Sequence, residues 1–149
     1  MNVDTRLAIA ALLACGCALA FAQAVPAAPS ARELHSAECV AALQASTEAL
    51  AQQVKAGNDA VRPLLQSRLE AGTAFVGDAY LNGTTDEKRA RALANNALEA
   101  QKSLSAAELA SRQEACAVEG TALLADSNGL ERSIVKRMAK KRMDRLLGG

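Results

Sequence analysis

The sequence predicts an all-α protein: an antiparallel four-helix bundle with a fifth, basic helix at the C-terminus and one inter-helix disulfide. The composition favours helices, because alanine fills 35 of the 149 positions and aromatic residues make up only 2%. Strands, by contrast, favour aromatic and β-branched side chains. Apolar residues recur three and four positions apart, as they do along the buried face of a helix. The length fits one domain with a modest core.

The first two helices are predicted from their start and stop signals, after a linker at residues 25–29. Ser30 and Glu33 have the spacing of a capping box, so a helix is expected from Ser30 to Gly57. A second helix is expected from about residue 58 to 82, with Pro63 near its first turn, where the missing N–H does least harm. The positions expected to face the core are Val40, Leu43, Thr47, Leu50 and Val54, followed by Val61, Leu65, Leu69, Val76 and Tyr80.

Three further helices are expected in the second half of the chain. Thr84 with Glu87, and Ser105 with Glu108, repeat the capping-box spacing and predict helix starts at Thr84 and Ser105. Residues 126–129 break the pattern, and a last helix is expected over residues 130–147. Short connections favour antiparallel neighbours, with the last helix across or beside the first four. The expected core positions are Leu93, Ala94, Ala97, Leu98, Leu109, Cys116, Gly120, Leu123, Leu124, Ile134, Val135, Met138 and Leu146.

Residues 1–24 are predicted to be a signal peptide that is cleaved near Ala24, which leaves residues 30–149 as a single helical domain. Arg6 precedes an apolar run, and Ala22-Gln23-Ala24 has the small-x-small pattern that signal peptidase accepts. The run has about 15 residues, fewer than the roughly 20 that span a bilayer, so no transmembrane helix is expected in the mature protein. The alanine-rich leader resembles bacterial examples, which predicts a periplasmic or secreted protein. The alternative is a lipid anchor on Cys15, because Leu12-Leu13-Ala14-Cys15 loosely resembles a lipoprotein processing box.

Cleavage would leave two cysteines, Cys39 and Cys116, and an even pair in an oxidising compartment favours a disulfide. The bond would close a loop of roughly 78 residues, for which loop entropy predicts about 4 to 5 kcal/mol of stabilisation. Antiparallel first and fourth helices would bring both cysteines to about the same height. The alternative is a pair of buried free thiols. A redox-active pair is disfavoured, because Cys-x-x-Cys spacing is missing from the mature chain.

The chemistry-bearing residues predict no catalytic site, no metal site and no cofactor. His35 is the single histidine, which excludes a multi-histidine zinc or iron site. A hydrolase would need His35 as its base, and no glycine-rich nucleophile turn accompanies it; we expect it to be an exposed residue early in its helix. The alternative is a helical bundle that carries haem or another cofactor, with His35 and Met138 or Met143 as axial ligands.

The last helix differs from the rest in charge, with seven basic residues against two acidic ones from residue 131 onward, while the net charge of the chain is only +1. Such a helix could bind an anionic surface or pair with the acids of the bundle. We therefore predict a non-enzymatic binding protein of the cell envelope, whose partner is another protein or an anionic envelope polymer and not a nucleic acid. The candidate surface for this partner is Arg132, Lys136, Arg137, Lys140, Lys141, Arg142 and Arg145.

Overall fold

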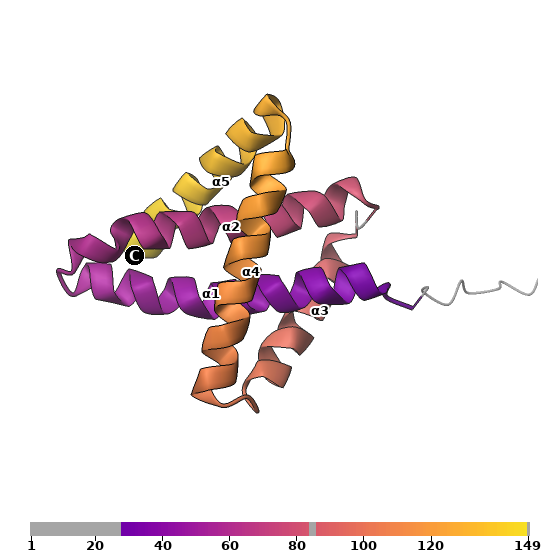
Figure 1. Ribbon diagram of the computed structural model, residues 1–149, viewed down its shortest axis with the longest axis horizontal. Helices are drawn as coiled ribbons and strands as arrows, with labels where there is room; N and C mark the ends of the chain where they lie inside the picture. The colour runs from indigo at the N-terminus through magenta and orange to yellow at the C-terminus, as the bar shows by residue number, and fades with distance from the viewer. Residues whose placement is uncertain (1–27, 84–85, 149) are drawn as a thin grey trace, which may run out of the picture.

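The computed structural model describes residues 28–83 and 86–148 and confirms the predicted fold class (Figure 1). The described residues form five α-helices and one 3₁₀ turn, without strands. The predicted signal peptide and the alternative lipid site at Cys15 lie outside the described residues. The elements are α1 (Ala31–Lys55), η1 (Asp59–Val61), α2 (Arg62–Leu81), α3 (Glu87–Gln101), α4 (Ala106–Asp126) and α5 (Gly129–Gly148).

Two of the predicted helix starts are confirmed as capping boxes. The hydroxyl of Ser30 accepts from the backbone N–H of Glu33 at 3.2 Å, and the Glu33 carboxylate accepts from the N–H of Ser30 at 2.8 Å. Ser105 and Glu108 make the same pair of bonds at the start of α4. The third predicted capping residue, Thr84, lies outside the described residues.

The third helix, α3, begins at Glu87, after Asp86 as its N-cap residue. The Asp86 carboxylate accepts from the N–H of Arg89 at 3.1 Å. Aspartate is at least as good an N-cap as threonine, so the acid closer to the apolar segment caps the helix.

Helices α1 and α2 form an antiparallel hairpin that supplies most of the core (Figure 1). The turn between them passes through Gly57, whose φ of +94° lies in the left-handed region that favours glycine. Two apolar clusters lie along this hairpin. The disulfide-end cluster contains Cys39, Ala42, Leu43, Ala71, Phe75 and Cys116. The α5-end cluster contains Leu50, Ala51, Val54, Leu65, Leu69 and Ala139.

Helix α4 crosses both helices of the hairpin (Figure 1) and is bonded to α1 through the predicted disulfide. Cys39 and Cys116 have their Cα atoms 5.2 Å apart, and both residues are buried. Next to this bond, α4 approaches α2 at Gly120. A Cβ atom built on Gly120 would lie 2.7 Å from the carbonyl oxygen of Ala71. The crossing therefore depends on the absence of a side chain at Gly120.

Helices α3 and α5 complete the bundle from two sides. Helix α3 packs on α1, where the Gln101 amide donates to the carbonyl of Glu38 at 2.9 Å. Helix α5 packs mainly on α2, and its C-terminal end lies beside the α1–α2 turn (Figure 1). Val135 and Ala139 form its buried contact. None of the helices in the described ranges has a stretch long and apolar enough to cross a bilayer.

Most predicted core positions are buried or half-buried, but four of them are exposed. Val76 and Tyr80 of α2 are 49% and 63% exposed, and Ile134 and Met138 of α5 are 47% and 51% exposed. The prediction that these four residues face the core is therefore wrong. Their helices do present an apolar face there, but no neighbouring helix closes over it. An open apolar surface results.

Candidate functional site

The exposed apolar residues line a groove between α2, α4 and α5, which we call the apolar groove. Its volume is about 620 Å³, within the range of small-molecule sites in proteins. Its apolar walls come from all three helices. They are formed by Val76 and Leu81 of α2, Leu123 and Leu124 of α4, and Ile134 and Met138 of α5.

Two arginines line a separate hollow next to the apolar groove. This hollow of about 150 Å³ shares Val76 and Met138 with the groove and is also lined by Arg142 and Arg145. Along α5, positions 134, 138, 142 and 145 are spaced by four, four and three, so their side chains lie on one face of the helix. This face changes from apolar at Ile134 to cationic at Arg145.

The end of the apolar groove away from this hollow is acidic. Asp78, Asp126 and Glu131 line it there. Asp78 is bound by Arg32, with an oxygen–nitrogen distance of 2.6 Å, and the Glu131 carboxylate accepts from the backbone N–H of Asn128 at 3.1 Å. The groove therefore has a polarity along its length, and an anionic group is favoured at the end next to Arg142 and Arg145.

Arg142 and Arg145 differ from the other basic residues of the predicted surface in what they contact. Within the described residues neither makes an ion pair, and Arg142 is half-buried beside the apolar walls. A half-buried guanidinium binds an anion more tightly than an exposed one, because less water screens the interaction. These two residues are the part of the predicted surface that faces a cavity.

Arg132 belongs to the predicted surface by sequence but has a structural role. Its guanidinium donates to the carbonyl oxygens of Leu124, Ala125 and Ser127, at 3.2, 2.8 and 2.9 Å. These carbonyls lie at the C-terminal end of α4, where they have no N–H donor within the helix. A cation is favourable there because it also interacts with the negative end of the helix dipole. Arg132 therefore ties the start of α5 to the end of α4.

The remaining four basic residues, Lys136, Arg137, Lys140 and Lys141, are all exposed on α5. Lys140 is 3.4 Å from Asp144 one turn later, a pair with both side chains mostly in solvent. Such exposed pairs contribute little to stability. These residues form a cationic outer face that is separate from the arginines at the groove. The structure thus divides the seven predicted residues into three groups instead of one surface.

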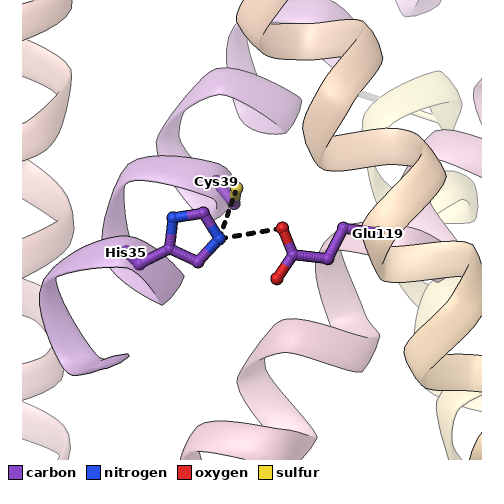
Figure 2. A group of neighbouring side chains, drawn as sticks. All are labelled: His35, Cys39 and Glu119. Atoms are coloured by element: carbon purple, nitrogen blue, oxygen red, sulfur yellow. Dashed lines mark hydrogen bonds and ion pairs between the residues drawn. The ribbon is translucent and has the colours of Figure 1, made fainter. Parts of the chain in front are cut away.

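A second group of interest surrounds the disulfide and was not predicted from the sequence. His35 Nε2 lies 2.8 Å from a carboxylate oxygen of Glu119 and 3.9 Å from the Cys39 sulfur (Figure 2). The expectation that His35 is exposed is correct, since about half of its side chain is in solvent. Its ring also contacts the edge of Phe75, with the centroids 6.2 Å apart. His35 therefore covers the buried disulfide from the solvent side.

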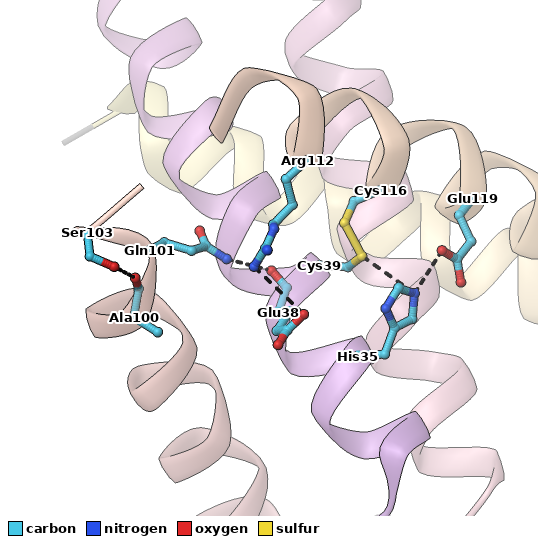
Figure 3. A network of polar contacts seen from close by, with 9 residues as sticks. All are labelled: His35, Glu38, Cys39, Ala100, Gln101, Ser103, Arg112, Cys116 and Glu119. Carbon is cyan, nitrogen blue, oxygen red and sulfur yellow. Dashed lines mark hydrogen bonds and ion pairs between the residues drawn. A yellow bond between two sulfur atoms is a disulfide. The ribbon is translucent and has the colours of Figure 1, made fainter. Parts of the chain in front are cut away.

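The sequence contains a signal for this group in the spacing of its residues, although they match no known motif. His35 and Cys39 are four residues apart on α1, and Cys116 and Glu119 are three apart on α4. Each spacing puts two side chains on one helix face. Only the crossing of α1 and α4 brings the two pairs together (Figure 3).

Polar contacts flank this group and join α1 to α3 and α4 (Figure 3). Arg112 of α4 lies 3.7 Å from the Glu38 carboxylate, next to the Gln101 bond to the Glu38 carbonyl. The other Gln101 side-chain atom, Oε1, is buried without a hydrogen-bond partner among the described residues.

The residues considered as haem ligands lie in three different environments. His35 is beside Glu119 and Cys39, whereas Met138 lines the apolar groove. Met143 packs against the α5-end cluster. The structure therefore offers no support for pairing His35 with either methionine.

Two carboxylates have a pKa that is lowered from its ordinary value, and both belong to capping boxes. The backbone bond to Ser30 is the main cause at Glu33, followed by the side-chain bond from Arg89. At Glu108 the hydroxyl of Ser105 is the main cause of the lowered pKa, followed by the backbone bond to the same residue. Both pKa values are lowered by hydrogen bonds at helix starts, so they do not indicate a reactive site.

No protein-family model, no curated protein and no solved structure matches the chain. The function of the protein must therefore be inferred from the apolar groove, the charges around it and the disulfide.

Proposed function

We propose that this protein is a non-enzymatic binding protein of the cell envelope and that its ligand is a single-chain anionic amphiphile. The apolar groove accepts the chain, and Arg142 and Arg145 bind the anionic head. The observation that carries the proposal is the face of α5 that runs from apolar to cationic, from the apolar groove into the smaller hollow beside it. A ligand of this class matches both ends of that face.

The energetics favour such a ligand over a purely apolar or purely ionic one. Each Å² of apolar surface that is buried contributes about 25 cal/mol to the binding free energy, so the contribution grows with the length of the ligand's apolar chain. A hydrogen bond from a charged donor contributes about 1.5 to 3 kcal/mol. The exposed side chains of Val76, Ile134 and Met138 would lose water on binding, and the arginines would gain a partner.

The compartment of this proposal is the periplasm, reached by export and removal of residues 1–24. The disulfide fits an oxidising compartment outside the cytoplasm. The envelope contains two sources of the proposed ligand chemistry, free fatty acids and lysophospholipids with anionic heads. The mass of the exported protein tests the compartment, because cleavage starts the chain at Val25 whereas a lipid anchor adds mass at Cys15.

The ligand is tested by calorimetric titration of the purified protein with palmitate, lysophosphatidylglycerol and lysophosphatidylcholine, each below its micelle concentration. We expect one binding site, with the anionic lysophospholipid preferred over the zwitterionic one. Palmitate and lysophosphatidylglycerol distinguish the two sources, because the tighter ligand identifies the head group that the arginines accommodate.

Variants locate the site. We expect R142Q/R145Q to weaken binding of the anionic ligands at least about tenfold, since two charge-assisted contacts are lost. K136Q/R137Q removes the same charge from the outer face and should change the affinity less than about twofold. I134S/M138S alters exposed groove residues and should weaken all three ligands. If K136Q/R137Q weakens binding and R142Q/R145Q does not, the outer face binds an anionic surface and the groove proposal is wrong.

A further inference from the structure

Four metal-binding side chains meet where α1 crosses α4, and the proposed ligand of the apolar groove uses none of them. The potential ligand atoms of His35, Cys39 and Glu119 all lie within 4.8 Å of one another. Cys116 adds a second sulfur, bonded to that of Cys39. We infer that reduction of the Cys39–Cys116 disulfide creates a binding site for a zinc-class divalent cation, with Cys39, Cys116, His35 and Glu119 as its four ligands.

Two of the separations in this cluster are short enough for ligands of one tetrahedral ion. Two ligands of one zinc ion lie at most about 4.6 Å apart, which is twice a Zn–S bond of about 2.3 Å. The separations of 3.9 Å from Cys39 to His35 and 2.8 Å from His35 to Glu119 are both within this limit. Two sulfurs, one imidazole nitrogen and one carboxylate oxygen are all donors that zinc accepts. Four donors complete a closed, structural type of coordination.

The redox state decides whether the site exists. In the disulfide the two sulfurs are bonded to each other and no thiolate is present to bind a cation. A dithiol reductant transfers two electrons and two protons to the bond, which gives two thiols while the reductant becomes a disulfide. The cation then displaces the two thiol protons and binds both sulfurs as thiolates.

The position of the cluster allows a cation to enter without unfolding the protein. The side chains of His35 and Glu119 are 51% and 47% exposed, whereas both cysteines are buried beneath them. An arriving ion would meet the nitrogen and oxygen donors first. The ligands come in two pairs, one from α1 and one from α4, and each pair is held by its helix spacing (Figure 3).

The bound cation would replace the lost covalent link between α1 and α4. Both the disulfide and the metal site join the same two helices at the same crossing. Metal binding that occurs only in the folded state stabilises that state in proportion to occupancy. The fold would therefore keep a crosslink under oxidising and under reducing conditions.

The test uses the full chain with C15S/C17S, so that Cys39 and Cys116 are the only thiols. The protein is reduced with a dithiol, freed of it under nitrogen, and titrated with Co²⁺ as a spectroscopic substitute for Zn²⁺. We expect one Co²⁺ per chain, with thiolate charge-transfer absorption and the visible bands of a tetrahedral complex. The oxidised protein should show neither. A reduced, helical protein without these bands would overturn the inference.

Single substitutions assign the ligands. H35A and E119Q should each weaken Co²⁺ binding at least about tenfold, a loss seen even when a group only supports a ligand. E38Q is the matched control, because Glu38 is an exposed carboxylate nearby that pairs with Arg112; its affinity should change less than about twofold. Equal affinity in H35A, E119Q and the parent would show that the thiols alone bind the ion, and the four-ligand site would be wrong.

Reduction could also unfold the chain, and the experiment remains decisive in that case. Circular dichroism then measures whether Zn²⁺ restores the helical signal, as expected where metal binding and folding are coupled. Restoration in the parent, and its loss in H35A and E119Q, supports the site. Failure of Zn²⁺ to restore helix in the parent overturns it.

Discussion

Helices α4 and α5 both pack on α2, but they are held there by different interactions. The buried residues of α4 are Cys116 and Gly120, and those of α5 are Val135 and Ala139. Helix α4 has a covalent bond and a close backbone approach at its crossing. Helix α5 is held by apolar side chains instead, since Met143, Leu146 and Leu147 pack around the α5-end cluster. Helix α4 is thus held by a covalent bond and a close backbone contact, and α5 by apolar side chains.

Helices α4 and α5 also differ in the chemistry that each supplies. The crossing of α4 holds the disulfide and the histidine above it, so its chemistry depends on redox state. The exposed face of α5 borders the apolar groove and supplies its charge. Stability measurements on variants of α4 and α5 can therefore test how each helix is held, without any ligand.

The largest expected effect follows from removing the disulfide. C39A/C116A should lower the free energy of unfolding by about 4 kcal/mol, because the bond closes a loop with a sequence separation of 77 residues. The matched change on α5 is V135A, which should cost about 2 kcal/mol through lost burial and a small cavity. Urea unfolding followed by circular dichroism measures both. Equal losses would mean that α4 and α5 are held alike.

A smaller effect is expected from adding one methyl group at the helix crossing. G120A places a Cβ atom 2.7 Å from the Ala71 carbonyl oxygen, so α4 and α2 must separate. We expect a loss of about 1 to 3 kcal/mol. G77A is the control, because nothing lies within 4 Å of a Cβ atom at Gly77, and alanine there should add up to about 1 kcal/mol of stability. A neutral G120A would show that the crossing is looser than described.

The smallest expected effect concerns pH at the start of α4. The pKa of Glu108 is lowered by its bonds to Ser105, from an ordinary value of 4.5. A group with a depressed folded-state pKa stabilises the fold above its unfolded-state pKa and loses this contribution as the pH falls through the folded-state value. The stability of the protein should therefore fall as the pH drops below the ordinary value of 4.5.

The variant S105A removes the hydroxyl that lowers the pKa of Glu108. It should reduce stability by about 1 kcal/mol near neutral pH, as loss of an N-cap does, and should make the acid dependence shallower. S133A alters an exposed serine of α5 and should leave the slope unchanged. An unchanged slope in S105A would assign the acid dependence to other groups, such as Glu33, whose pKa is lowered in the same way.

Local signals in the sequence predicted the helices well because their causes lie within a few residues. The capping boxes at Ser30 and Ser105 need only a hydroxyl and a carboxylate three positions apart. For α3 the sequence offers two capping side chains, Thr84 and Asp86, and the described helix begins after Asp86. Periodicity alone does not rank two caps that lie so close together.

The apolar pattern was less informative about the site. Val76, Tyr80, Ile134 and Met138 follow the helical period as faithfully as Leu65 and Leu69 do. The latter two are buried and the former four are exposed. Period identifies the apolar face of a helix, but another helix must cover that face before it becomes core.

The all-helical class, the helix starts with capping boxes and the pairing of Cys39 with Cys116 could be predicted from the residues alone. These features depend on local hydrogen bonding, on periodicity and on the number of cysteines outside the predicted signal peptide. Which apolar faces stay open, which arginines lie near them and which side chains surround the disulfide became known only from the packing of the helices. The reason is geometric: α4 approaches α2 closely where Gly120 meets Ala71, and contacts of this kind join residues far apart in the chain.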